Sequence, residues 1–176
     1  GYNAVNKILE FYNTKKIAMN HTALIHATTA SMLWVYGDFY IFRINTGGYF
    51  LFDILYLLRN REINLLHGLY YYHHCVCLYY MTLDPKIYNW FNTIAVGEMS
   101  NIPSYFVYHY LKKNPNHINL KKWKIIQKVW YGVLRMVILS YMTYNEVMDP
   151  VKTLTVMPVL PVYFMGLLWT FAIFYQ

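Results

Sequence analysis

Five residues with charged or imidazole side chains lie near the middles of four otherwise apolar segments of this chain. They are Asp53, His73, His74, Glu98 and Arg135. A histidine whose tautomer is fixed by a carboxylate can act as a general base or as a nucleophile in acyl transfer. We therefore take His73 and His74 as candidate catalytic residues, with Asp53 or Glu98 as the acid that orients the imidazole.

The same residues have two other interpretations that involve no reaction. The polar centre can bind a lipid headgroup or an acyl carbonyl without turning it over. It can also be a structural clasp, in which Arg135 pairs with Asp53 or Glu98 and thereby fixes how the helices pack. An ionised side chain in an apolar segment is costly when it stands alone, so all three interpretations predict that these residues cluster.

A metal centre is disfavoured by the spacing of its potential ligands. His67 joins His73 and His74 in a loose group of three, and no second histidine group follows. Cys75 and Cys77 lie two positions apart but lack the second pair that a zinc site needs. We therefore predict no metal ligands and no bound cofactor.

Helical spacing determines which of these side chains can border one cavity. His73 and His74 are adjacent, so they lie about 100° apart around a helix and both can face the interior. Tyr70 precedes His74 by four residues and shares its helix face. His26 lies about a third of the way through the first apolar segment. We expect His26 and Tyr70 beside the polar centre.

The amino-acid composition indicates the kind of protein in which these residues lie. The chain has 176 residues, of which 57% are hydrophobic, 20% aromatic and only 13% charged. A soluble domain carries about 25% charged residues, so disorder and a small disulfide-linked module are excluded and an integral membrane protein is favoured. The two cysteines are too close together to link distant parts of the chain.

Six apolar segments are long enough to cross a bilayer, which takes about 20 helical residues. They form a single domain over residues 1–176 and comprise about 17–40, 41–58, 63–83, 86–111, 123–145 and 151–175. Asp84 and Asp149 each precede a proline, a pattern typical of a helix N-cap followed by the first helical residue. The chain begins at Gly1 and ends in an apolar segment at Gln176, which is compatible with trimmed ends.

The basic residues are distributed unevenly between the loops of this six-segment arrangement. Eleven Lys and Arg fall on one side and three on the other, while Arg135 lies within a segment. The positive-inside rule then places both visible ends in the cytosol. The net charge of +7 is therefore a solvated rim that attracts anionic lipid headgroups, and nucleic acid is not expected as a partner.

Several short motifs in this chain resemble those of the TLC-domain family, which includes the ceramide synthases and smaller lipid-homeostasis proteins. In chain order they are Ile25-His26-Ala27, Gly48-Tyr49-Phe50-Leu51-Phe52-Asp53, His73-His74, Glu98-x-Ser100 with Pro103 nearby, and Arg135. Each motif is weak alone, and their order and spacing carry the resemblance.

The resemblance implies an all-α integral membrane protein with six transmembrane helices around a central, lipid-accessible cavity. It implies an endoplasmic reticulum or other endomembrane location and long-chain acyl or sphingoid membrane lipids as partners. A homodimer is left open. We assign six residues to lipid or cavity binding, namely His26, Tyr49, Tyr70, Glu98, Ser100 and Arg135.

The resemblance is compatible with two functions, lipid binding and acyl transfer. Ceramide synthases carry an acidic signature downstream of the histidine pair, and this chain lacks it. We therefore expect a protein that binds or senses long-chain lipids and influences membrane lipid composition. The alternative is an acyl-CoA-dependent N-acyltransferase of the ceramide synthase type, in which the His73–His74 pair acts and acyl-CoA is a co-substrate.

Overall fold

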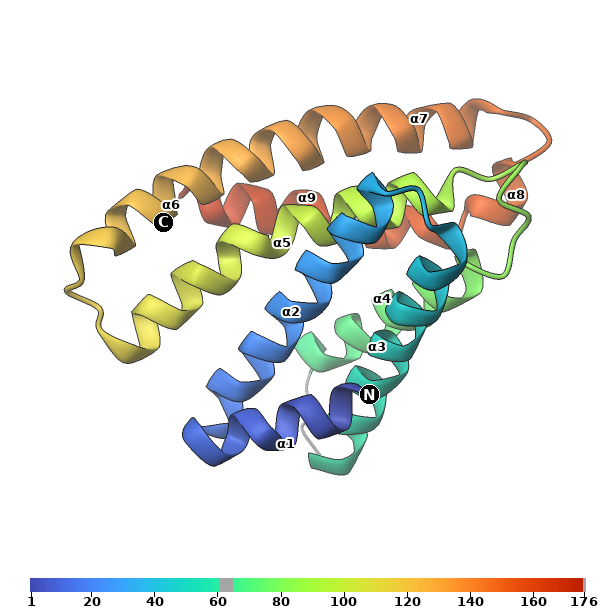
Figure 1. Cartoon of the computed structure of the whole chain (residues 1–176). Coiled ribbons are helices and arrows are strands. Elements are labelled where there is room, and N and C mark those ends of the chain that lie inside the picture. Colours follow the sequence, from blue (N-terminus) through green and yellow to red (C-terminus); the bar gives the residue numbers. More distant parts are fainter. Residues whose placement is uncertain (61–64, 176) are drawn as a thin grey trace.

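The computed structural model describes residues 1–60 and 65–175, and every regular element within them is helical (Figure 1). In chain order the elements are α1 (Tyr2–Tyr12), α2 (Lys15–Val35), α3 (Phe39–Asn60), α4 (Leu65–Tyr80), α5 (Trp90–Lys113), α6 (Ile118–Tyr131), the π-helical segment η1 (Gly132–Leu139), α7 (Ser140–Met148), α8 (Thr153–Val156) and α9 (Val159–Phe174). The all-helical part of the prediction is confirmed.

The membrane-spanning part of the prediction is wrong. Within the described ranges, no helix combines the length and the apolarity that crossing a bilayer requires. α4 and α9 have 16 residues each, which is short of the roughly 20 needed. The longer α2, α3 and α5 carry polar and charged residues along their length. Three predictions that depend on membrane spans are therefore wrong. They are the six transmembrane helices, the multi-pass endomembrane location and the cytosolic placement of both ends.

Helix bounds also differ from the expected segments. α1 lies ahead of the first expected segment, and the expected start of the third, at residue 63, lies outside the described residues. Asp84 and Asp149 are not helix N-caps, since Asn89 precedes α5, Lys152 precedes α8, and Asp149 is the C-cap of α7. Asp84 belongs to a turn, and α5 begins only at Trp90. Asp149 accepts from the backbone N–H groups of Val151 and Thr153 in the turn before α8.

A long helical run crosses the top of the molecule in Figure 1, formed by α6, η1 and α7 in succession. Its middle is wound as a π-helix, which packs one residue more into each turn than an α-helix. π-helical turns are rare and frequently occur at functional sites. Here the segment carries Arg135 into the interior, where the side chain is buried.

α5 lies at the centre of the bundle, with α2 packed on one side and the α6–η1 run on the other. α3 and α4 pair with each other, and α9 contacts α4, α6 and η1. The largest fully buried side chains are Trp90, Phe42 and Phe50, which belong to the main hydrophobic core. α5 therefore brings its polar residues, Glu98 among them, to the middle of the molecule.

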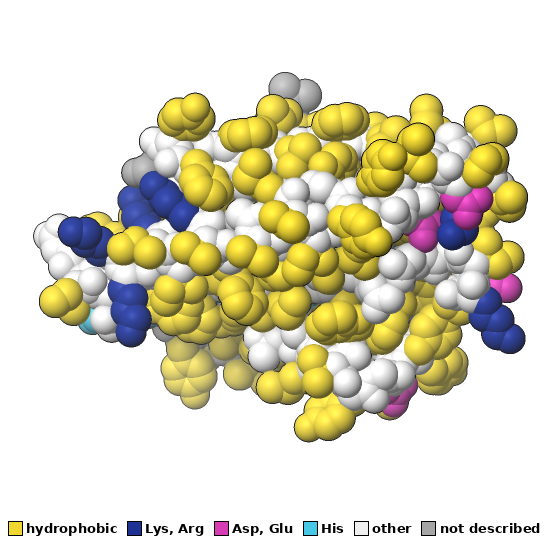
Figure 2. Space-filling view, turned by 90° about the horizontal axis from the view of Figure 1, so that it is seen from above, with side chains coloured by type: hydrophobic (Ala, Val, Ile, Leu, Met, Phe, Trp, Pro, Cys, Tyr) yellow, Lys and Arg dark blue, Asp and Glu magenta, His cyan; other side chains and the backbone are white. Residues whose placement is uncertain are grey.

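The outer surface separates apolar and charged side chains. Figure 2 shows the face over the α6–η1–α7 run, where hydrophobic side chains cover most of the surface. Lys and Arg gather at one end of this face, and Asp and Glu lie at the other end together with further basic side chains. Exposed apolar residues of this run include Val129, Val137, Tyr141 and Met148. An apolar surface this extensive is unusual unless it contacts another apolar phase or partner.

Candidate functional site

Two histidine–carboxylate pairs lie inside the bundle and join four helices. His26 Nε2 of α2 lies 3.5 Å from Glu98 Oε2 of α5. His74 Nδ1 of α4 lies 3.1 Å from Asp53 Oδ2 of α3. All four residues are buried, and neither contact forms a hydrogen bond. Each pair thus places an imidazole nitrogen within 4.0 Å of a carboxylate oxygen across two helices.

Aromatic rings from α3 separate the two pairs and position the imidazoles. Tyr49 stacks on His26, with ring centroids 4.0 Å apart and an interplanar angle of 8°. Its neighbour Phe50 stacks on His74 at 4.8 Å and 20°. Tyr2 of α1 closes the His26 side, because its hydroxyl donates to Asn45 Oδ1 at 2.6 Å and lies 3.3 Å from His26 Nδ1. Each imidazole of the two pairs is thus stacked on an aromatic ring of α3.

Arg135 lies beside these pairs but is bonded to neutral groups. Its Nε donates to Ser100 Oγ at 2.8 Å and its Nη2 donates to Asn101 Oδ1 at 2.9 Å. The guanidinium also lies 4.8 Å from the ring centroid of Tyr131. The pairing of Arg135 with Asp53 or Glu98 that a structural clasp requires is absent from the described part of the chain.

A cavity of about 60 Å³, here called the central cavity, lies between α4, α5, the η1–α7 run and α9. One part of its lining is polar and includes His73, Glu98, Asn101 and Arg135. Another part is apolar and includes Val76, Leu139, Val159 and Val162. The central cavity is thus amphipathic, like a ligand with a polar end and a hydrocarbon chain.

The structure brings most of the predicted site residues together, in two groups. His73, Glu98 and Arg135 line the central cavity. Asp53, His74, His26 and Tyr49 form the adjoining pairs and stacks, and Ser100 holds Arg135. Tyr70 instead packs on Trp169, with ring centroids 5.1 Å apart.

Sequence reasoning missed three residues of the site. Asn101 and Tyr163 line the central cavity, and Tyr2 contacts His26 from α1. The position of Asn101, three residues after Glu98 on α5, was a usable signal because such residues share a helix face. No local pattern indicates Tyr2, whose contact depends on how α1 packs against α2 and α3.

Burial and neighbouring charges shift the pKa values of His73 and Glu98 in the lining of the central cavity. Desolvation first and the charge of His74 second lower the pKa of His73 to about 3. Burial alone raises the pKa of Glu98, but the contacts with His26, together with His73 and His74, outweigh it and lower that pKa overall. At neutral pH the cavity therefore contains a neutral His73 beside an ionised Glu98.

Acid is expected to destabilise the fold through His73. The unfolded chain binds a proton at this histidine below about pH 6.5, whereas the folded chain resists protonation down to about pH 3. The contribution of His73 to the free energy of unfolding is therefore fully present above about pH 6.5. It falls as the pH drops, by at most about 1.4 kcal/mol per pH unit. Glu98 also makes the fold less stable in acid, because its pKa is lower in the folded chain than in the unfolded chain.

Thermal unfolding followed by circular dichroism at pH 7 and pH 5 tests this expectation. The His73→Gln variant should lose less stability between the two pH values than the parent chain. His117→Asn is the matched control, because His117 caps α6 with its ring and lies outside the cavity lining. An unchanged pH dependence in His73→Gln would show that other groups control acid sensitivity.

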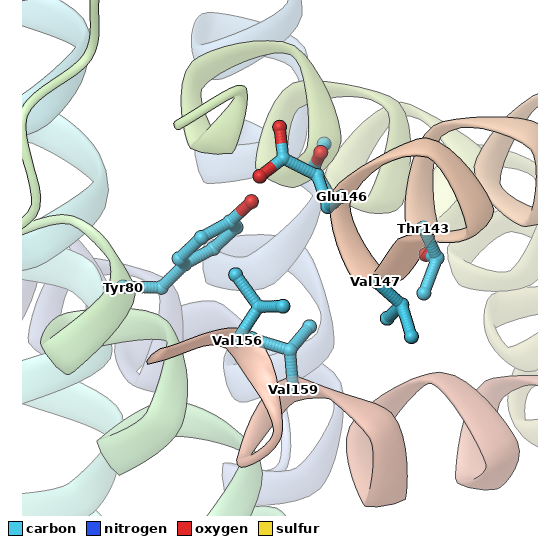
Figure 3. A pocket seen from close by; sticks show the side chains of 7 residues that line it. Tyr80, Thr143, Glu146, Val147, Val156 and Val159 are labelled. Carbon is cyan, nitrogen blue, oxygen red and sulfur yellow. The ribbon is translucent and has the colours of Figure 1, made fainter. Parts of the chain in front are cut away.

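A smaller cavity of about 10 Å³ adjoins the central cavity and shares Tyr80, Thr93, Thr143 and Val159 with it. Figure 3 shows the Tyr80 hydroxyl pointing toward the Glu146 carboxylate above Val156 and Val159. Burial and the Glu146 charge raise the pKa of Tyr80 above its ordinary value. Volume of this size suffices for about one water molecule.

Comparisons with protein-family models, curated proteins and solved structures find no match for this chain. The resemblance to the TLC-domain family therefore stays a prediction based on the motifs. Among residues 1–60 and 65–175, no group of three or more potential ligands is arranged to hold a metal ion. The function has to be inferred from the cavity itself.

Proposed function

We propose that this protein binds long-chain lipids, with the polar end of the lipid in the central cavity. The observation that carries the proposal is the amphipathic lining of the cavity. Hydrogen-bonding groups of Glu98, Asn101 and Arg135 face the same space as the valines of α4 and α9. Ligand sites commonly combine an apolar lining with a few polar groups that fix orientation.

Two further features support this ligand class. The cavity holds only a small part of a long-chain molecule, and the apolar outer surface offers contact area for the rest. The TLC-like motifs point to the same long-chain acyl or sphingoid lipids and to a role in lipid homeostasis.

A second candidate function, N-acyl transfer from acyl-CoA, is favoured by the His74–Asp53 pair. A base oriented by a carboxylate can take the proton of an amine while the amine nitrogen attacks the thioester carbonyl and the CoA thiolate leaves. However, His74 is absent from the cavity lining, and His73, which lines the cavity, has no carboxylate at ion-pair distance in the described part of the chain. Lipid binding without turnover therefore agrees better with the geometry.

Thermal unfolding in the presence of a panel of long-chain acids, amines and alcohols tests lipid binding. A ligand at 100 times its Kd adds about 2.7 kcal/mol of stability, which raises the Tm of a chain of this size by about 5–10 °C. The variant Val162→Phe partly fills the cavity and should lose this response. Val151→Phe, at a position with 80% of its surface exposed, is the matched control.

The outcomes of this experiment separate the candidates. Equal responses of both variants would place the lipid outside the cavity and contradict the proposal. Adding a long-chain acyl-CoA together with a lipid amine, and following free CoA, tests transfer in the same preparation. CoA release that disappears in His74→Ala would establish the second function instead.

A further inference from the structure

Arg135 is a buried cation that forms no direct ion pair with a described carboxylate. Only 8% of its surface is exposed, and no carboxylate in the described part of the chain lies within 4.0 Å of its nitrogens. The acceptors that it uses are the hydroxyl of Ser100, the amide of Asn101 and, at 3.5 Å, the carbonyl of Gly97. A buried charge is costly unless an opposite charge compensates it.

The guanidinium retains an unused donor. Its Nη1 makes no hydrogen bond to any described residue, whereas Nε and Nη2 are both engaged. Gly166 of α9 makes room for this nitrogen, because a Cβ at that position would lie 2.6 Å from it. The N–H groups of Nη1 can therefore donate charge-assisted hydrogen bonds to an oxygen of a bound carboxylate.

Other charged groups around the central cavity are already engaged or neutral. Glu98 lies 3.5 Å from His26 on the α2 side and forms no ion pair with Arg135. His73 is the remaining titratable imidazole of the lining, and it is neutral at physiological pH. Arg135 is thus the cationic side chain that the described lining offers to a ligand.

We infer that the polar end of the bound lipid is a carboxylate that pairs with Arg135, so that the ligand class is a long-chain free acid. The inference rests on the proposed lipid-binding function and specifies its ligand. A cavity of about 60 Å³ accommodates a carboxylate and its first methylene groups beside Val76, Val159 and Val162. The rest of the chain has to extend beyond the cavity.

Binding of three ligands with one hydrocarbon chain tests this assignment in the unaltered protein. Oleic acid, methyl oleate and oleyl alcohol are titrated at pH 8, where the acid is ionised, and complexes are quantified by native mass spectrometry. We expect the acid to bind at least tenfold more tightly than the ester or the alcohol, since hydrogen bonds between ionised partners are the strong ones. Oleyl phosphate is included to separate a carboxylate from a phosphate headgroup.

Three variants test whether Arg135 causes the tighter binding of the acid. Arg135→Gln should bind the acid and the ester equally well. Arg43→Gln should retain the parent preference, because Arg43 is an exposed arginine on α3 outside the cavity lining. Gly166→Ala leaves the arginine in place but displaces its guanidinium, so acid affinity should fall several-fold while ester affinity stays unchanged. The last variant keeps the assignment testable if Arg135→Gln fails to fold.

Each alternative outcome has a distinct meaning. Equal affinity for acid, ester and alcohol would overturn the carboxylate assignment and leave lipid binding intact. Tighter binding of the phosphate than of the acid would also overturn it. Absence of binding for all four compounds would overturn the proposed function itself. A preference for the acid that survives in Arg135→Gln and Gly166→Ala would place the carboxylate elsewhere and overturn the assignment.

Discussion

Replacing Trp90 by alanine is expected to lower the free energy of unfolding by about 3–5 kcal/mol. Trp90 is fully buried at the first turn of α5 and packs against Phe39, with ring centroids 5.1 Å apart. Its indole Nε1 donates to the carbonyl of Leu83 at 3.0 Å. The substitution therefore removes a large buried surface and leaves the partly buried carbonyl of Leu83 without its donor.

Chemical denaturation followed by circular dichroism measures this loss. Phe171→Ala is the control, because Phe171 lies on α9 with 48% of its surface exposed and should change stability by about 1 kcal/mol or less. Trp90→Phe should fall between the two, since the ring remains and the hydrogen bond is lost. A loss in Trp90→Ala no larger than that in Phe171→Ala would contradict the placement of Trp90 in the core.

The second large effect is expected at the His74–Asp53 pair. His74→Phe keeps the ring that stacks on Phe50 but removes the nitrogen that lies 3.1 Å from the Asp53 carboxylate. Asp53 would then be a buried carboxylate without its imidazole partner, which should cost about 3 kcal/mol. Adding Asp53→Ala to this variant removes the unpaired charge, so the double variant should lose less than the sum of the single losses.

A double-mutant cycle measures this coupling, which we expect to reach about 1–2 kcal/mol. The control cycle combines Asp53→Ala with Arg135→Gln. These two residues share no contact partner in the described part of the chain, so their losses should add within about 0.5 kcal/mol. Coupling between Asp53 and Arg135 larger than that between Asp53 and His74 would favour the structural clasp over the observed pairs.

The membrane prediction failed because composition describes the whole chain, whereas crossing a bilayer depends on uninterrupted apolar helices. The abundance of hydrophobic residues was read correctly, and many of them are exposed. α9 begins only after Pro158 and has 16 residues, and α5 carries Glu98 in its interior and two lysines at its end. The beginning of α9 is a helix boundary, which the sequence indicates poorly.

The clustering of the polar residues could be predicted from the sequence, but their pairing could not. The sequence indicated that Glu98, Arg135 and the histidine pair lie on helices and cluster, because isolated polar groups in an apolar interior are costly. It did not indicate which acid pairs with which histidine. Glu98 pairs with His26 rather than with the adjacent histidines, and Arg135 turns to Ser100 and Asn101.

The sequence by itself therefore determined an all-helical chain with a small set of polar residues directed inward from apolar helices. The tertiary structure decided how those residues pair. It places His73 in the cavity lining and His74 beside Asp53, and it brings Tyr2 against His26. The physical reason is that helical geometry fixes contacts only between residues three or four positions apart. Contacts between helices depend on packing angles and on the π-helical turn at Arg135, which no local pattern in this chain specifies.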